Sequence, residues 1–130
     1  MRAVPAVTGA LLLLLASAAG AAAQDVKAGE KSFLKCRACH QVGETAKNGV
    51  GPKLNGLFGR KAGSIVGFNY SEANKGSNVT WTEDVFAKYI RDPKAFTPGN
   101  KMLFPGLKAD AEIANVVAYL KQFDADGKKK

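Results

Sequence analysis

The chain has 130 residues, of which 19 are Lys or Arg and 11 are Asp or Glu, so its formal net charge at pH 7 is +8. This length is enough for one small domain and excludes a second. The positive charge favours acidic partners, whether these are proteins, nucleic acids or lipid headgroups.

The chain begins with Met1 and Arg2, followed by an uncharged segment from Ala3 to Ala23 that contains five consecutive leucines and ends in three alanines. A basic start, an apolar centre and small residues at the end are typical of a secretory signal peptide. We therefore predict a signal peptide over residues 1–23 and, in a Gram-negative bacterium, export to the periplasm. An uncleaved membrane anchor is the alternative, because 21 uncharged residues are just enough to span a bilayer.

Cleavage would make Gln24 the first of 107 mature residues, with 18 Lys and Arg against 11 Asp and Glu and a formal charge of +7, since Arg2 is removed. An exported chain without a recognised nucleic-acid motif is not expected to bind DNA or RNA. We expect a monomer that does not insert stably into a membrane after signal removal. Residues 24–126 are predicted to form the domain and residues 127–130 a disordered basic tail.

The first predicted helix runs from Val26 to Ala38, because Val26, Gly29, Phe33 and Cys36 recur at spacings of three and four. Glycine is costly inside a helix unless another element must come close to it. We therefore expect a second helix to cross the first at Gly29.

This helix leads into Cys36-Arg37-Ala38-Cys39-His40, in which a Cys-x-x-Cys pair is followed directly by His. The pattern is the attachment signature of c-type haem. Residues three apart face the same side of a helical turn, so both thiols can reach the vinyl groups at one edge of a flat porphyrin. His40 then follows where an imidazole nitrogen can bind the iron. We predict one haem c, attached covalently through Cys36 and Cys39.

Three other interpretations share parts of this motif. A dithiol redox motif of the thioredoxin type needs a βαβ pattern around it, whereas the apolar spacing here is helical. A zinc site needs a fourth ligand, and the sequence holds no further Cys or His. A disulfide between Cys36 and Cys39 fits the spacing but leaves His40 without a role.

Residues Gly43–Gly67 hold seven glycines in 25 positions and show neither a helical nor a strand period. A loop of this length in a small domain is usually functional, and we expect it to wrap the edge of the haem. Residues Tyr70–Asn74 are predicted to form a short helix.

Two further helices are predicted after this loop. Thr80 and Glu83 have the spacing of a capping box, which predicts a helix that ends before Asp92-Pro93. Its buried face would consist of Val85, Phe86, Tyr89 and Ile90. The last helix, near Ala109–Phe123, shows the clearest helical period, at Ile113, Val116, Val117 and Leu120. With helices as the only regular elements, the predicted fold class is all-α.

The sixth coordination position of an iron bound by His40 decides between an electron carrier and an enzyme. Met102 is the only methionine outside the predicted signal peptide. It follows Pro98 and Gly99 in an extended or turned stretch, whereas a core methionine usually packs on a helix face. Because the chain has no second His and no spare Cys, we predict that Met102 is the other axial ligand.

Five separated stretches resemble the class I cytochromes c, and within them the small bacterial cytochromes c2. They are Cys36-Arg37-Ala38-Cys39-His40, Gly51-Pro52-Lys53-Leu54-Asn55-Gly56-Leu57-Phe58-Gly59-Arg60, Gly67-Phe68-Asn69-Tyr70, Trp81, and Gly99-Asn100-Lys101-Met102 through Gly106. Their mutual spacing also fits this family. The resemblance implies an all-α cytochrome c fold in which the N- and C-terminal helices cross, and loops and short helices wrap around one covalent haem.

The resemblance also implies roles for individual residues. Cys36 and Cys39 would carry the haem thioethers, and His40 and Met102 would be the axial metal ligands. The Pro52 carbonyl would accept a hydrogen bond from the second nitrogen of His40, which fixes the orientation of the imidazole ring.

Five further residues are implied to surround the cofactor. Those expected to hold the propionates are Arg60, Tyr70 and Trp81, and those expected to form a polar network beside Met102 are Asn74 and Tyr89. Two positions depart from the pattern of the family. Asn100 stands where Thr commonly precedes Lys-Met, so the resemblance does not carry over a hydrogen bond from this position near a propionate. Asn55 replaces a His that is frequent in mitochondrial members.

With both axial positions filled by the chain, one-electron exchange between Fe(II) and Fe(III) remains, and we expect no enzymatic activity. The resemblance implies a carrier from a cytochrome bc1 complex to a photosynthetic reaction centre or a terminal oxidase. A ring of positive charge at the haem edge would steer it onto acidic docking surfaces of these complexes. The lysines nominated by the resemblance are Lys35, Lys47, Lys53, Lys94, Lys101 and Lys108.

Two other functional classes stay open at this point. A haem whose bond to Met102 is labile would act as a peroxidase-type enzyme. A haem-free binding module that uses the dithiol would be colourless when purified.

Overall fold

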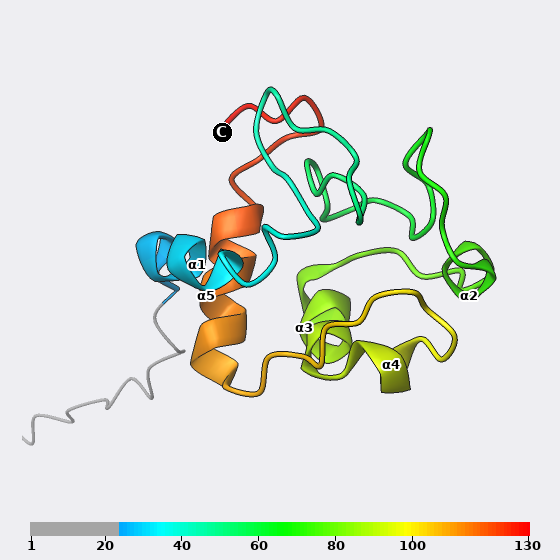
Figure 1. The fold of residues 1–130 in the computed structure, drawn as a ribbon. Helices are drawn as coiled ribbons and strands as arrows, with labels where there is room; N and C mark the ends of the chain where they lie inside the picture. Colours follow the sequence, from blue (N-terminus) through cyan, green and yellow to red (C-terminus); the bar gives the residue numbers. More distant parts are fainter. Residues whose placement is uncertain (1–23) are drawn as a thin grey trace, which may run out of the picture.

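The computed structural model describes residues 24–130, and the signal peptide predicted over 1–23 lies outside them. Five helices follow one another along the described chain (Figure 1): α1 Val26–Phe33, α2 Glu72–Lys75, α3 Glu83–Arg91, α4 Pro93–Phe96 and α5 Asp110–Leu120. Residues 24–130 contain two isolated β-bridges and no strand. The all-α prediction is therefore confirmed. None of the helices in this range is long and apolar enough to cross a membrane.

The first and last helices, α1 and α5, cross at one side of the molecule (Figure 1). They approach so closely that a side chain at Gly29 would clash with the backbone carbonyl of Asn115 and lie 2.9 Å from Cβ of Tyr119. The rings of Phe33 and Tyr119 pack against each other with centroids 5.3 Å apart. The crossing predicted from Gly29 is therefore confirmed, and it places the end of α1 beside the core.

α1 ends at Phe33, whereas the spacing of apolar residues predicts an end at Ala38. Beyond Phe33, the amides of Cys36 and Arg37 both donate to the Phe33 carbonyl, and the amides of Cys39 and His40 both donate to the Cys36 carbonyl. Shared carbonyls of this kind tighten the backbone into turns. The cysteines consequently lie on two consecutive turns after the helix and not on its last turn.

The N-cap of α3 lies two residues later than predicted. Thr82 is the N-cap, and its Oγ1 accepts a hydrogen bond of 3.1 Å from the amide of Val85. The predicted capping box at Thr80 is wrong, because Thr80 pairs with Lys61 in an isolated bridge before the helix starts. The predicted buried face holds for Phe86, Tyr89 and Ile90, while Val85 is only partly buried.

α4 is a short helix that the sequence pattern does not predict. Asp92 is its N-cap and accepts a hydrogen bond of 3.0 Å from the amide of Ala95, while Pro93 occupies the first turn. Proline is favoured there because its missing N–H would have no partner in any case. The proline that ends α3 therefore begins the helix that leads toward Met102.

The C-terminal residues fold back on the chain in this structure, whereas the sequence predicts a disordered tail over 127–130. The amide of Asp124 donates to the Lys128 carbonyl and the amide of Lys130 to the Gln122 carbonyl, both at 2.9 Å. Gly127 is buried and packs against the backbone of Gly43. The lysine side chains are polar, but backbone hydrogen bonds and close packing order the segment.

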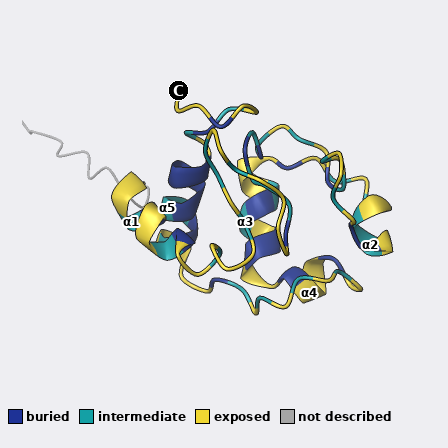
Figure 2. Cartoon of the chain, turned by 45° about the horizontal axis from the view of Figure 1, so that its top comes forward, coloured by how far each residue is buried: buried dark blue, intermediate teal, exposed yellow. Residues whose placement is uncertain are grey.

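The core lies where α1, α3 and α5 face one another (Figure 2). Phe33, Ile90, Val116 and Leu120 are each at most 4 % exposed. All four apolar residues that predict the last helix are buried in α5. The chain from 34 to 71 contains no helix, and this long connection runs above α5 and α3 in the view of Figure 1.

Candidate haem site

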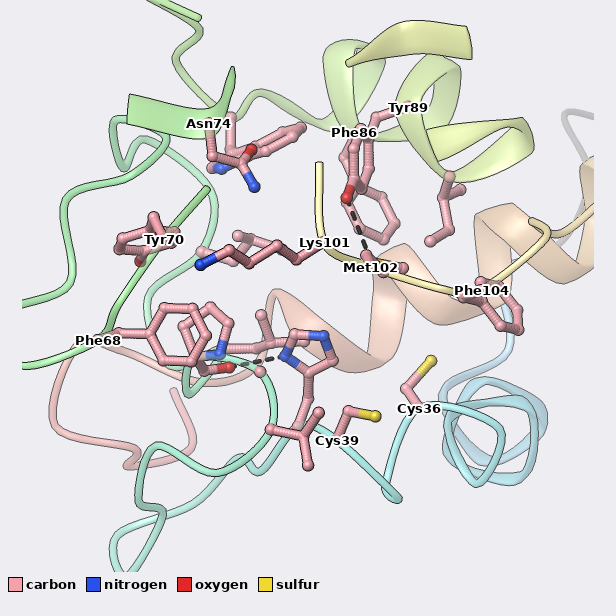
Figure 3. A pocket seen from close by; sticks show the side chains of 18 of the residues that line it. Cys36, Cys39, Phe68, Tyr70, Asn74, Phe86, Tyr89, Lys101, Met102 and Phe104 are labelled. Carbon is pink, nitrogen blue, oxygen red and sulfur yellow. Dashed lines mark hydrogen bonds between the residues drawn. The ribbon is translucent and has the colours of Figure 1, made fainter. Parts of the chain in front are cut away.

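A cavity of about 470 Å³ opens between the core helices and the loops. Apolar side chains of α3 and α5 form one part of its wall, among them Phe86, Ile90, Val116 and Leu120. The predicted cofactor-binding residues all line this cavity; they are Cys36, Cys39, His40, Pro52, Arg60, Tyr70, Asn74, Trp81, Tyr89 and Met102. Figure 3 shows Cys36 and Cys39 on one side of the pocket and Met102 across from them.

Cys36 and Cys39 present two free thiols to this cavity. They are not joined to each other, which argues against the disulfide interpretation. Burial raises the pKa of the Cys36 thiol to about 11, so this thiol is uncharged at neutral pH. Two free thiols at one edge of an apolar cavity are suited to thioether bonds with a flat apolar ligand.

His40 is fixed by the loop that follows it. Its Nδ1 lies 2.7 Å from the Pro52 carbonyl oxygen, the contact that the resemblance implies. A side chain at Gly51 would clash with the imidazole ring, so the ring packs directly on the backbone there. Burial lowers the pKa of His40, although the hydrogen bond to Pro52 acts in the opposite direction. A neutral imidazole that donates from Nδ1 to a carbonyl keeps Nε2 as the lone-pair nitrogen, which is the form that binds a metal.

Met102 lies in the loop between α4 and α5. Its Sδ accepts a hydrogen bond of 3.2 Å from the hydroxyl of Tyr89, a residue of α3 (Figure 3). Burial raises the pKa of Tyr89 to about 12, so the phenol keeps its proton over the physiological range. The Tyr89 ring packs edge-on against Trp81, with centroids 4.8 Å apart. The thioether is therefore oriented by a buried donor.

Arg60 brings a positive charge to the cavity wall. Its Nη1 donates to the carbonyls of Asn55 at 3.0 Å and Lys53 at 3.2 Å. Burial lowers its pKa, and none of the ion pairs formed within residues 24–130 includes it. A partly buried guanidinium without a carboxylate partner suits a ligand that brings carboxylates of its own.

The other polar residues predicted around the cofactor differ in what they contact. Tyr70 and Trp81 are buried in the cavity wall, and the Tyr70 hydroxyl accepts a hydrogen bond of 3.1 Å from the amide of Ile65. In residues 24–130 the side chain of Asn74 forms no hydrogen bond, and the Tyr89 hydroxyl bonds to Met102 instead. The implied network of Asn74 and Tyr89 is thus not made by a direct bond between them.

The nominated lysines fall into two groups. Lys35 forms an ion pair with Glu112, and Lys108 donates to the carbonyls of Arg91 and Pro105. No such partner is found in the described chain for the side chains of the other four, which are Lys47, Lys53, Lys94 and Lys101. Lys35 and Lys101 line the cavity.

Two contacts of the site were not foreseen from the sequence. Asn55 is buried and binds both backbone groups of Gly43 at 2.9 Å, which pins the loop after His40. Asn100 bonds to the amide of Met102 at 2.8 Å. The sequence shows that Asn55 and Asn100 depart from the pattern of the family. Their partners are backbone groups that only the fold brings near, so the sequence does not predict these bonds.

The donor set of this cavity fits haem c. Two thiols, one neutral imidazole and one thioether converge on an apolar space with an unpaired guanidinium at its wall. Within residues 24–130, no group of three or more His, Cys, Asp or Glu side chains is placed to hold a metal ion. A zinc site is therefore not supported, and His40 and Met102 are the candidate ligands of a haem iron.

A family model described as cytochrome c matches residues 26–124, which is most of the described chain. The chain belongs to the cytochrome c family. This cytochrome c is 58% identical over 120 residues to the cytochrome c2 of Blastochloris viridis, a match that covers 92% of this chain and 94% of the relative. It is also 58% identical over 106 residues to the cytochrome c-550 of Nitrobacter winogradskyi, covering 82% of this chain and 97% of that one.

The solved structure of cytochrome c2 from Rhodospirillum centenum has the same fold. It is 41% identical to this cytochrome c, with a TM-score of 0.74 over 77% of this chain and 98% of the other. The predicted resemblance to class I cytochromes c, most closely cytochrome c2, is therefore confirmed. The family binds haem c covalently, and Cys36 and Cys39 have the spacing for its two thioether bonds.

Proposed function

We propose that this cytochrome c is a periplasmic one-electron carrier between a cytochrome bc1 complex and a photosynthetic reaction centre or a terminal oxidase. The relatives named cytochrome c2 and cytochrome c-550 support the broader statement that the chain is an electron-carrying cytochrome c. The observation that carries the proposal is that one cavity receives an imidazole from one wall and a thioether from the other.

Haem c supplies a one-electron couple between Fe(II) and Fe(III) when it is bound. Cys36 and Cys39 would attach it, and Nε2 of His40 and Sδ of Met102 would hold its iron from both sides. No position is then left for oxygen, peroxide or a substrate. A soft thioether and burial away from water favour the reduced ion and raise the potential.

A peroxidase would require that Met102 leave the iron readily. The thioether accepts a hydrogen bond from Tyr89, and the backbone of Met102 is bonded to Asn100. Both contacts restrain Met102 and therefore favour a carrier that is not an enzyme. Neither ligand needs to change during electron exchange, so the transfer requires little rearrangement.

The docking surface would be the open side of the cavity. Val50 and Leu103 line the cavity, yet they are 79% and 93% exposed, so this edge faces solvent. Lys101 extends over the pocket from the same loop as Met102 (Figure 3). Lysines around an exposed apolar edge would steer the carrier onto acidic surfaces of the membrane complexes and let it leave quickly.

Charge reversal at Lys101 tests this docking surface. In Lys101→Glu, the second-order rate constant for reduction by cytochrome bc1 should fall about tenfold at low ionic strength, and the loss should shrink as salt rises. The reduction potential should stay nearly unchanged. Lys27→Glu, with the same charge change on exposed α1 outside the cavity wall, should have a much smaller effect. Rates insensitive to both Lys101 and salt would contradict the docking proposal.

The periplasmic location rests on the predicted signal peptide. Expression of the full chain should yield a coloured protein in the periplasmic fraction whose first residue is Gln24. A membrane-bound protein that retains residues 1–23 would favour the anchor instead.

A further inference from the structure

Asn100 joins the backbone of Met102 to helix α4. Its Oδ1 accepts a hydrogen bond of 2.8 Å from the amide of Met102. Its Nδ2 donates to the carbonyls of Pro93 at 2.7 Å and Thr97 at 2.8 Å. These carbonyls belong to the first residue of α4 and to the residue that ends it. One side chain therefore ties the ligand loop to the helix before it.

The orientation of the Asn100 amide follows from its partners. The reverse orientation would set the NH₂ group against the amide N–H of Met102 and the oxygen against two carbonyls. Only the observed orientation pairs every donor with an acceptor. Both N–H groups are consequently used within the protein, and Asn100 has no donor left for a carboxylate of the cofactor.

α4 is itself firmly placed. Pro93 is less than 2% exposed, Thr97 is 6% exposed, and Asp92 caps the helix at its start. Tyr89, which donates to the Met102 thioether, lies one turn before α4 on α3. Asn100 therefore fixes the Met102 backbone relative to the helix pair that also orients its sulfur.

A methionine side chain has three rotatable bonds and is costly to hold in one place. Asn100, two residues earlier, holds the backbone amide of Met102, and this removes part of that cost before the sulfur binds. We propose that Asn100 is a positioning residue that keeps the Met102 thioether on the haem iron and is not a propionate ligand. The inference rests on the proposed role of Met102 as an axial ligand.

Three substitutions separate the contributions of Asn100. Asn100→Ala removes all three hydrogen bonds. Asn100→Asp keeps an acceptor for the Met102 amide but turns a second oxygen toward the carbonyls of Pro93 and Thr97. Asn100→Thr supplies one hydroxyl and cannot replace three bonds. Asn78→Asp is the matched charge control, because Asn78 is exposed and forms no side-chain hydrogen bond in the described chain.

The test is an imidazole titration of each purified, haem-loaded ferric protein, followed by its visible spectrum. A thioether that is no longer held by Asn100 would give up its coordination position on the iron to imidazole more readily. The apparent affinity for imidazole should therefore rise about tenfold in Asn100→Ala and Asn100→Asp. Both should also show a weaker far-red charge-transfer band. Asn100→Thr, which carries the common family residue and should fold, is expected to show a smaller rise of a few-fold. Asn78→Asp should match the unsubstituted protein.

A purely structural role would lower the denaturant midpoint of the variants without raising their affinity for imidazole, and this result would overturn the proposal. If Asn100→Thr is the only variant that loads haem, an affinity for imidazole equal to that of the parent protein would also overturn the proposal. Met102→Ala is titrated in parallel. If the parent protein lacks the far-red band and titrates like Met102→Ala, the axial role of Met102 fails, and this outcome is distinct from a failure of Asn100 alone.

Discussion

The two sides of the haem site are held in different ways. On the His40 side, the loop is tied by backbone bonds from Gly51 to Cys39 at 2.8 Å and from Leu54 to Gln41 at 3.0 Å. Asn55 adds two bonds to Gly43, and the C-terminal turn packs on the same glycine. His40 also directly follows Cys39, which would be bonded to the haem covalently. The His40 loop is therefore tied to the segments that follow the two crossing helices, α1 and α5.

On the Met102 side, the loop from α4 to α5 has fewer bonds between backbone groups, and side chains hold most of it. Met102 itself is held by Asn100 and Tyr89. Further along, the loop is fixed to α3 by the backbone bond from Leu107 to Ile90 and by the exposed ion pair of Arg91 with Asp110. Exposed ion pairs contribute little to stability.

The difference indicates which axial bond opens first. Segments with few buried contacts open locally at a lower free energy than the whole fold. The Met102 loop should open while His40 and the helices stay in place. With His40 and Met102 as the proposed ligands, the His40 side would keep the cofactor, and the Met102 side would set the properties of its iron.

The largest expected effect is a separation of two unfolding transitions. As denaturant is added to the ferric protein, the far-red band of the thioether should disappear before the helical circular dichroism does. The free energy for opening the Met102 loop should be several kcal/mol lower than the free energy of global unfolding, which is about 5–15 kcal/mol for small domains. Coincident transitions would mean that the two sides are held equally well.

A medium effect is expected at Asn55. Asn55→Ala leaves the partly buried amide of Gly43 without its partner and should lower the free energy of unfolding by about 2 kcal/mol, measured by denaturant titration. The far-red band of the native protein should not change. Asn48→Ala, at an exposed amide, should cost less than about 1 kcal/mol. A weaker far-red band in Asn55→Ala would show that the two sides are coupled.

The smallest effect is expected at Tyr89. Tyr89→Phe removes the hydroxyl that withdraws electron density from the Met102 sulfur. The sulfur then donates more strongly to Fe(III), so the reduction potential should fall by about 30 mV, as measured by redox titration. Tyr119→Phe, on α5 outside the cavity wall, should leave the potential unchanged. A rise in potential for Tyr89→Phe would contradict the proposed bond.

The sequence predicts the parts of this molecule whose partners are near in sequence or follow a period. The motif at Cys36–His40, the crossing at Gly29 and the buried face of α5 are of this kind. The sequence also predicts Met102 as an axial ligand, because no other methionine lies outside the predicted signal peptide.

Contacts to distant backbone groups could not be predicted in the same way. The three bonds of Asn100 depend on the turn after α4, and α4 was missed because Pro93 was interpreted only as an end signal. The C-terminal residues carry three lysines, so their composition hides the backbone bonds that order them.

The central claim is that the chain supplies the iron with His40 on one side and Met102 on the other. The most direct measurement is the proton NMR spectrum of the reduced protein, because a methyl group held over a porphyrin face is shifted strongly upfield by the ring current. The account predicts one three-proton resonance upfield of all other methyls, absent in Met102→Ala. A methionine methyl at an ordinary shift in the unsubstituted protein would contradict it.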